Sequence, residues 1–325
     1  MRTLLTTAAT AAFCTAIVGM VAPAAAVDFP CRNIKVIAQA NAGGSTDLGA
    51  RMTSEMANKL GAKPKLQVVN MGAQGGAEAM AYLQDSKPDG CTLMYGHWNP
   101  TLLYITGRSK IHPAKDFEPV ALISTSPRAI GAAKEVPYNN IAEMIDYVKA
   151  NGFESVVAGA TLGATSHFEI LLVAKAGGVK IKTVSYNHSR ERLTALLANN
   201  IQLGDMGALA AGGYIKKGQL KALGVLAAKR SPAIPDVPTA LEVGYDVQFA
   251  IDHGFYAPKG TPKAVIDYYV DLFGKVTKDA GFIKKNQVKD VHMRFMPSGE
   301  YKAFLMKNFE ELKAIAIDIG IYEGK

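Results

Sequence analysis

Residues 34–61 decide the fold, and they read IKVIAQANAGGSTDLGARMTSEMANKLG. The apolar run at 34–38 predicts a strand, and a loop of small residues follows at 41–47. An apolar residue then recurs every four positions, at Leu48, Met52, Met56 and Leu60. This spacing predicts one face of a helix, which Gly61 ends. A strand, a small-residue loop and a helix in this order form one unit of an α/β protein.

The same unit recurs along the chain. Strand-like runs stand at 66–69 and 92–95 in the first half, and at 155–158, 182–185 and 221–226 in the second. Repeated strand–loop–helix units predict parallel strands covered by helices. The segment 229–238 holds three Pro in seven residues, so we expect it to be irregular. A last helix is expected from Ser298, which is a good N-cap residue.

Composition narrows the class of protein. The 325 residues are 49% hydrophobic and 20% charged, which excludes a disordered chain and predicts one large or two medium domains. The net charge of +8 is dispersed, because no block of Lys and Arg occurs. Dispersed positive charge fits a protein that attracts small anions. With one Trp in the chain, aromatic platforms for nucleic acid are not expected.

The N-terminus has the pattern of an export signal. After Arg2 the chain is uncharged to residue 27, and the apolar stretch closes with PAAA at 23–26. This predicts a cleavable signal peptide at 1–26 and a periplasmic protein. A membrane anchor is the alternative, but the stretch is barely long enough and contains Thr and Pro.

Cys31 and Cys91 are the cysteines that remain after the predicted cleavage. Each stands just before a predicted strand, and an even pair in an oxidising compartment favours one disulfide. If the two strands are parallel neighbours, their starts lie close enough to be bridged. Two free buried thiols are the alternative.

The two halves of the chain predict two domains. By connectivity, we expect one lobe at 27–124 plus 254–325 and a second lobe at 125–253. The chain then crosses between lobes near 124–127 and near 252–255, and these two crossings would form a hinge.

Four predicted strand-to-helix junctions carry small polar residues: 43–47, 72–76, 161–166 and 187–189. Ligands of open α/β sheets bind at the carboxyl ends of strands, and helix starts offer unpaired N–H groups to anions. Two junctions from each lobe could therefore hold one anion from both sides. Helix capping alone is the alternative for any single junction. These junctions contribute Thr46, Gln74 and Asn187 to the candidate ligand-binding residues.

The sequence gives no support for nucleotide binding, catalysis or metal binding. Neither a phosphate-binding G-x-x-x-x-G-K-[ST] loop nor a G-x-S-x-G nucleophile elbow occurs. Ser166 and His167 are adjacent, so their side chains diverge at a helix start and a catalytic pair is not expected. The six His are scattered. We therefore expect no enzyme activity, no cofactor and no metal.

Seven segments, in order along the chain, resemble motifs of one family. They are NAGGSTDLGAR at 41–51, PDGCTL at 88–93, KDFEPV at 115–120, GATSH at 163–167, YNHSRERLTALL at 186–197, KRSPAIPDVP at 229–238 and APKGTP at 257–262. The chain thus resembles the Bug family, the extracytoplasmic receptors of tripartite tricarboxylate transporters. No single motif is specific, but the ordered set spans the mature chain.

This resemblance implies an α/β periplasmic-binding-protein fold with two lobes, each a mainly parallel sheet flanked by helices. It also implies that the lobes close on a small carboxylate, held by amides and hydroxyls of facing loops. The matching positions are Gly43, Gly44, Ser45 and Asp47 in one lobe, and Thr161, Thr165, Ser166 and Asp205 in the other. Capping of its own helix is an equal alternative for Asp47.

Departures from the family pattern are informative. Positions that are commonly small are Arg190 and Arg192 here, and an Arg at a helix start opposes the dipole unless it serves an anion. Arg190 is a candidate for a second carboxylate, with a solvated surface Arg as the alternative. Trp98 follows a predicted strand end, so it either stacks on a ligand ring or packs in the wall.

The leading hypothesis is a monomeric periplasmic receptor that binds a di- or tricarboxylate or an aromatic acid. Its partners would be the ligand and the membrane permease of a tripartite tricarboxylate-type transporter. Two alternatives stay open. One is a sensor that presents its ligand to a kinase, and the other is a secreted enzyme, for which no nucleophile–base pair is recognisable.

Overall fold

The computed structural model describes residues 27–97, 99–186 and 189–324, so the predicted signal peptide lies outside the described residues. The chain begins with β1 (Asn33–Ala38), α1 (Ser45–Lys59), β2 (Lys65–Asn70), the 3-10 turn η1 (Ala73–Gly76), α2 (Ala77–Gln84), β3 (Thr92–Gly96) and α3 (Asn99–Ile105). β1 lies between β2 and β3 and is parallel to both. The three strands predicted in this half are confirmed.

The long strand β4 (Phe117–Ala133) connects two sheets. Its first part pairs with β9 (Ala250–Pro258), as far as Pro127 opposite Ala250. From Arg128 onward it pairs with β7 (Leu203–Gly207) instead. Both predicted crossing segments, 124–127 and 252–255, therefore lie on two antiparallel strands that run side by side.

The second sheet carries its own helices. Its elements are α4 (Ile141–Asn151), the turn η2 (Phe153–Ser155), β5 (Val157–Ala160), α5 (Thr165–Ala176), β6 (Lys182–Ser185), α6 (Ser189–Leu197), β7, α7 (Ala208–Lys216) and β8 (Leu220–Val225). β5 begins two residues later than the strand predicted at 155–158. Ser155 explains the shift, because its hydroxyl donates to the carbonyl of Gly152 and closes the turn η2.

After the irregular segment 229–238 and the turn η3 (Leu241–Val243), β9 returns the chain to the first sheet. There follow α8 (Lys263–Lys278), α9 (Ala280–Gln287), β10 (His292–Pro297) and α10 (Ser298–Asp318). β10 pairs with β4 in an antiparallel sense. The last helix begins at Ser298, as predicted, but Ser298 is not its N-cap: Pro297 holds that position, and the Ser298 hydroxyl donates to the carbonyl of Pro119 at 2.6 Å.

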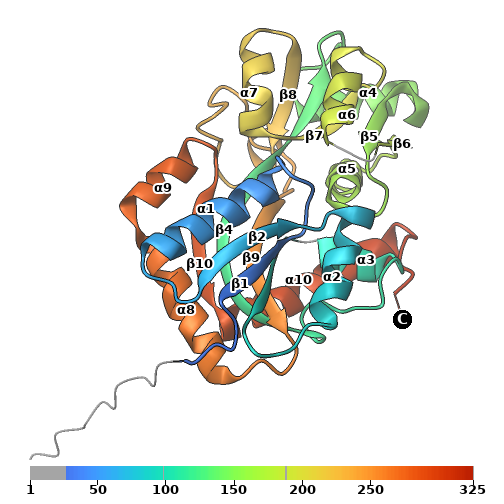
Figure 1. Ribbon diagram of the computed structural model, residues 1–325. Helices are drawn as coiled ribbons and strands as arrows, with labels where there is room; N and C mark the ends of the chain where they lie inside the picture. The colour runs from blue at the N-terminus through green and yellow to red at the C-terminus, as the bar shows by residue number, and fades with distance from the viewer. Residues whose placement is uncertain (1–26, 98, 187–188, 325) are drawn as a thin grey trace, which may run out of the picture.

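Figure 1 shows the resulting two lobes. β5 to β8 and α4 to α7 form one, β1 to β3 and β10 with their helices form the other, and β4 and β9 run between them. The two-lobed α/β prediction is confirmed. The sheets are mixed rather than mainly parallel, because each crossing strand enters its sheet against the direction of its neighbours. The exact lobe boundaries stay a prediction.

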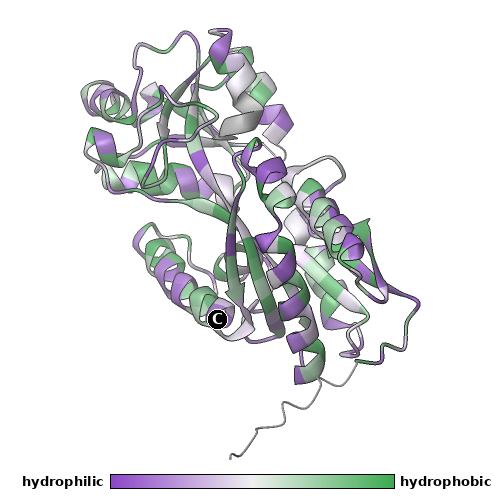
Figure 2. Ribbon diagram, turned by 90° about the vertical axis from the view of Figure 1, so that its left-hand side faces the viewer, coloured by the Kyte–Doolittle hydropathy of each residue, from purple (hydrophilic) through white to green (hydrophobic). Residues whose placement is uncertain are grey.

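The strands of both sheets are largely apolar, whereas the helices present hydrophilic residues outward (Figure 2). The predicted apolar face of α1 is confirmed at Met52 and Met56, which are half-buried against the core, and is wrong at its ends, where Leu48 and Leu60 are 43% and 42% exposed. Small residues such as Ala50 and Ala57 are buried instead. They let the helix approach the sheet so closely that a Cβ on Gly49 would lie 2.7 Å from the Tyr95 hydroxyl. This packing also turns Thr46 and Asp47 into the interior.

The Cys31–Cys91 disulfide is present, and it joins the segments that lead into the parallel neighbours β1 and β3. The prediction from the cysteine positions is thus confirmed. Of the helices formed by the described residues, none is both long and apolar enough to cross a membrane.

Candidate functional site

A cavity of about 1110 Å³ opens where loops at the strand ends of both lobes face each other. The first lobe contributes residues 39–44, 72–75, His97, Asn99, Leu103 and Arg108. The second contributes residues of the 161–166 loop and of α6 with its approach from Tyr186. This volume exceeds the usual range of about 300–1,000 Å³ for small-molecule sites.

Asp47 organises the loop between β1 and α1 from behind. Its carboxylate accepts hydrogen bonds from the Gly43 amide at 2.9 Å, from Arg51 Nε at 2.9 Å and from Asn70 Nδ2 at 2.8 Å. Burial alone would raise the pKa of Asp47, but these three donors outweigh it and the pKa is lowered. Asp47 is 3% exposed and does not line the cavity, whereas Gly43 and Gly44 do.

The loop at 72–76 owes its shape to consecutive left-handed residues. Gln74, Gly75 and Gly76 have φ of 53°, 69° and 95°. The carbonyls of Gly75 and Gly76 accept hydrogen bonds from Asn99 Nδ2 at 3.1 Å and Gln39 Nε2 at 3.4 Å. Glycine suits two of these positions because it adopts positive φ without a Cβ penalty. Gln74, which was predicted from this junction as a candidate ligand-binding residue, lines the cavity.

A pair of histidines lies under the first lobe's wall. His253 on β9 stacks on Tyr95 and shares a 3.1 Å hydrogen bond with the Thr46 hydroxyl. His97 meets the His253 ring edge-on and lines the cavity. Burial, reinforced by the positive charge of Arg128, lowers the pKa of His97 to about 4. This part of the wall is therefore uncharged at neutral pH.

In the second lobe, hydroxyl groups hold the loop before α5. Ser166 accepts a hydrogen bond from the Thr161 amide at 2.9 Å. The Thr161 hydroxyl donates to the carbonyl of Tyr186 at 2.8 Å, which ties this loop to the approach of α6. Thr161, Thr165 and Ser166 all line the cavity.

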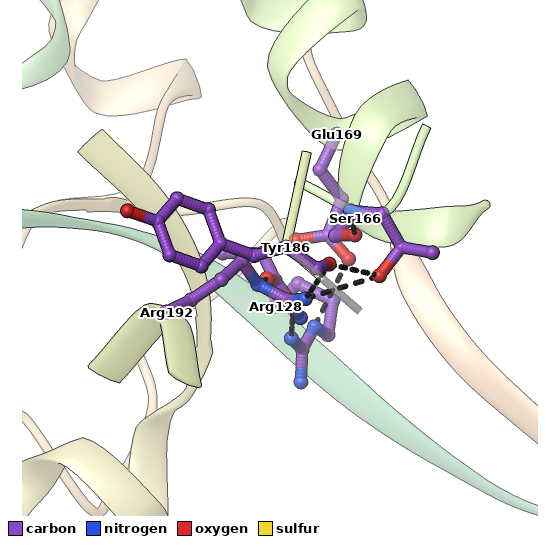
Figure 3. A network of polar contacts seen from close by, with 7 residues as sticks. Arg128, Ser166, Glu169, Tyr186 and Arg192 are labelled. Atoms are coloured by element: carbon purple, nitrogen blue, oxygen red, sulfur yellow. Dashed lines mark hydrogen bonds and ion pairs between the residues drawn. The ribbon is translucent and has the colours of Figure 1, made fainter. Parts of the chain in front are cut away.

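A network of four ionisable side chains, Arg128, Glu169, Arg192 and Asp205, runs from this wall into the interior (Figure 3). The carboxylate of Asp205 on β7 forms two ion pairs. Its Oδ1 accepts from Arg192 Nε at 2.7 Å, and its Oδ2 accepts from Arg128 Nη2. Arg128 Nε also pairs with Glu169 Oε1 at 3.1 Å. Asp205 is 8% exposed and Glu169 is fully buried, so both carboxylates contact other protein groups rather than solvent.

Glu169 is the most perturbed acid of this network. Desolvation raises its pKa to about 8, against the attraction of Arg128, with a smaller increase from Asp205. Its Oε2 atom has no hydrogen-bond partner among the described residues. At neutral pH a largely protonated Glu169 therefore adds little negative charge to the network.

The lobes touch at the edge of the cavity. Arg108, which follows α3, donates from Nη1 to the carbonyl of Leu162 at 3.0 Å. Gly163 lies so close to Thr106 that a Cβ would be 3.3 Å from the Thr106 hydroxyl. Farther out, Lys175 on α5 pairs with Asp318 on α10 at 2.6 Å. The 161–166 loop is therefore both a wall of the cavity and a contact between lobes.

The structure separates the predicted site residues into three groups. Those that line the cavity are Gly43, Gly44, Gln74, Thr161, Thr165, Ser166 and Arg190. Those that do not are Ser45, which is exposed, and Thr46, Asp47 and Asp205, which are buried behind it. Trp98 and Asn187 lie outside the described residues. Residues 27–97, 99–186 and 189–324 contain no cluster of His, Cys, Asp and Glu that could hold a metal ion.

Several site residues were missed from sequence: Gln39, His97, Asn99, Arg108, Arg128 and Glu169. Glu169 had a usable signal, because it is a single acid within the apolar run at 168–173. A charge in such a run needs a buried partner. Nothing local marked Arg128, whose partners come from distant elements.

Comparisons with known proteins agree with this geometry. The family model described as "Tripartite tricarboxylate transporter family receptor" matches residues 50–321. A UPF0065 protein of Bordetella pertussis is 32% identical over 242 residues, covering 73% of this chain and 74% of that protein. The UPF0065 protein in the gbd 5'region of Cupriavidus necator is 28% identical over 98% of this chain and 96% of its own.

Two solved structures have the same fold over nearly their whole length. The periplasmic binding protein BugD is 28% identical, with a TM-score of 0.76, covering 90% of this chain and 99% of its own. MatC (Rpa3494) from Rhodopseudomonas palustris with bound malate is 25% identical, with a TM-score of 0.76, covering 88% and 99%.

Proposed function

The chain belongs to the tripartite tricarboxylate transporter receptor family, and from this premise we propose that it is a periplasmic receptor for a small organic carboxylate. In this proposal the acid enters the cavity between the lobes, and the lobes close on it. The receptor then hands the acid unchanged to a membrane transporter of the tripartite tricarboxylate type.

The observation that carries the proposal is the positive character of the cavity. α1, α5 and α6 all begin at its wall, which includes Gly44, the N-cap of α1, and Thr165 and Ser189, the first residues of α5 and α6. Helix starts present unpaired N–H groups and the positive end of the helix dipole, which favour a carboxylate. Arg108, Arg190 and Arg192 add guanidinium groups to the lining, against the single carboxylate of Glu191.

The size and charge of the cavity favour a di- or tricarboxylate or an aromatic acid. Arg190 is exposed at the wall, and we propose that it attracts a second carboxylate. MatC, a relative in the same fold, is described with bound malate, which makes malate the first probe. Micromolar binding corresponds to about −8 kcal/mol. A few charge-assisted hydrogen bonds of about 1.5–3 kcal/mol each supply this order.

Thermal unfolding of ligand-stripped protein tests the proposal. The protein is unfolded in denaturant, dialysed, refolded and melted with malate, citrate, adipate and benzoate in turn. At least one acid should raise Tm by several degrees at saturating concentration, because it binds only the folded state. The diamide of malate is the matched neutral control. Failure of every acid in a wide panel to shift Tm would contradict the proposed function.

The delivery step needs a separate measurement. Immobilised mature protein, with and without the acid that shifts Tm, is exposed to detergent-solubilised membranes of the producing organism. Acid-dependent retention of transporter subunits supports delivery to a permease. Retention of a sensor kinase in their place would identify a signalling receptor.

A further inference from the structure

The guanidinium of Arg192 is held in one orientation. Nε donates to Asp205 Oδ1 at 2.7 Å, and Nη1 donates to the Thr161 hydroxyl at 3.2 Å and to the Tyr186 carbonyl at 3.4 Å. The residue is 5% exposed, so its long side chain has little freedom. A fork fixed at two nitrogens presents the third in a defined direction.

That third nitrogen, Nη2, has no hydrogen-bond partner among the residues that the structure describes. Arg192 nevertheless lines the cavity, although only 6% of its side chain is exposed. Nη2 is not one of the fully buried atoms that lack a partner, so it is accessible to a ligand. A charged donor that is accessible at the cavity wall and unpaired within the described residues offers a charge-assisted hydrogen bond to a ligand carboxylate.

The charge of the network points to an anion. Asp205 is shared by Arg192 and Arg128, so one carboxylate is paired with two guanidinium groups. Glu169 adds little negative charge at neutral pH, since burial raises its pKa to about 8. A buried excess of positive charge is unfavourable until an anion neutralises it.

Arg190 differs although it is only two residues away on α6. Its side chain is exposed, and none of the described residues is hydrogen-bonded to its guanidinium. An exposed, flexible Arg attracts anions at long range but imposes little geometry.

We propose that Arg192 is the specificity-determining residue that fixes one carboxylate of the bound acid through Nη2, and that Asp205 is its positioning residue rather than a ligand contact. This inference rests on the proposed function. It assigns recognition of a planar carboxylate to the second lobe and distinguishes two neighbouring arginines on one helix.

Calorimetric titration tests this inference. The ligands are malate and its two monoamides, or the acid that gives the largest Tm shift and its monoamides. Arg192→Gln should weaken malate binding by about 10- to 100-fold, the range of one lost charge-assisted contact. Arg190→Gln is the comparison variant and should cost less, under about threefold, because an exposed guanidinium attracts the second carboxylate without fixing it. One monoamide should bind the wild type weakly and lose nothing further in Arg192→Gln, because it lacks the carboxylate that Arg192 holds.

Equal losses in the two variants would overturn the inference, and so would equal losses of malate and both monoamides in Arg192→Gln, which would indicate a structural role. Arg192→Lys keeps the charge and serves if Arg192→Gln does not fold. It should still lose about 5- to 10-fold, because an ammonium lacks the fork. Wild-type protein that binds no acid would instead contradict the proposed function itself.

Discussion

The two walls of the cavity are built from different kinds of groups. Apart from Arg108 at the rim, the first lobe lines the cavity with small and apolar residues, side-chain amides and a neutral His97. The second lobe uses Arg190, Glu191 and Arg192, with Arg128, Asp205 and Glu169 behind them. Backbone geometry shapes one wall, while ion pairs hold long side chains in the other. The first should respond to changes in conformational freedom and the second to changes in charge.

The largest contrast should lie in the pH dependence of stability. Glu169 has a folded-state pKa of about 8, raised from 4.5, so the folded state binds its proton more tightly. Its stabilising contribution is therefore full below pH 4.5 and is lost as pH rises toward 8, by at most about 1.4 kcal/mol per pH unit. Urea unfolding at pH 5 to 8 should show a weaker decline in Glu169→Gln than in the wild type.

Asp47 in the first lobe gives the opposite sign. Its pKa is lowered, so its contribution is present above pH 3.8 and is lost as pH falls through the folded-state value. Asp47→Asn should therefore flatten the acid limb and leave pH 5 to 8 unchanged. The prediction for Glu169 has its own contradicting result. Parallel pH profiles for wild type and Glu169→Gln between pH 5 and 8 would show that Glu169 is ionised throughout this range.

The next effect compares the two buried aspartates at a fixed pH of 7. Asp205→Asn leaves two buried guanidinium groups without their shared carboxylate and should cost about 3 kcal/mol of unfolding free energy. Asp47→Asn keeps an acceptor for its loop and should cost about 1 kcal/mol. Denaturant titration measures both, and equal costs would remove the distinction between the walls.

A smaller effect tests the glycine-built wall. Gly76 has φ of 95°, and a Cβ there would lie 2.3 Å from Gln39 Cγ. Gly76→Ala should lower the free energy of unfolding by about 2 kcal/mol through backbone strain and displacement of Gln39. Gly299→Ala is the control, because its Cβ would meet no atom within 4 Å. A neutral Gly76→Ala, measured by urea unfolding, would show that the loop relaxes freely.

Local patterns were sufficient for much of the fold. Alternation and loop spacing placed β1, β2, β3, β6 and β8, and cysteine positions predicted the disulfide. The predicted face of α1 was wrong at Leu48, since close packing on Tyr95 favours small residues at the start of this helix. β4 was not recognised as one strand, because Pro119 and Pro127 interrupt its apolar pattern. Its pairing with β9 is a long-range contact.

The candidate site was predictable at the level of loops and not of side chains. Gly43, Gly44 and Thr161 were found because small polar junctions mark strand ends. The direction of Asp47 and Asp205 depends on partners that are distant in sequence, such as Asn70 and Arg128. Sequence therefore singled out Arg190, whereas tertiary contacts distinguish Arg192 as the fixed guanidinium.

The central claim is that both walls hold one acid, and calorimetric titration of ligand-stripped protein with malate, or with the acid of largest Tm shift, tests it most directly. Gly44→Val adds a side chain to the first wall, where the nearest atom to a Cβ is the Asn41 carbonyl oxygen at 3.6 Å. Gly44→Val in the first wall and Arg192→Gln in the second should each weaken binding at least about tenfold. Gly299→Ala should bind the acid as the wild type does. Unchanged affinity in both wall variants would place the acid outside this cavity and contradict the account.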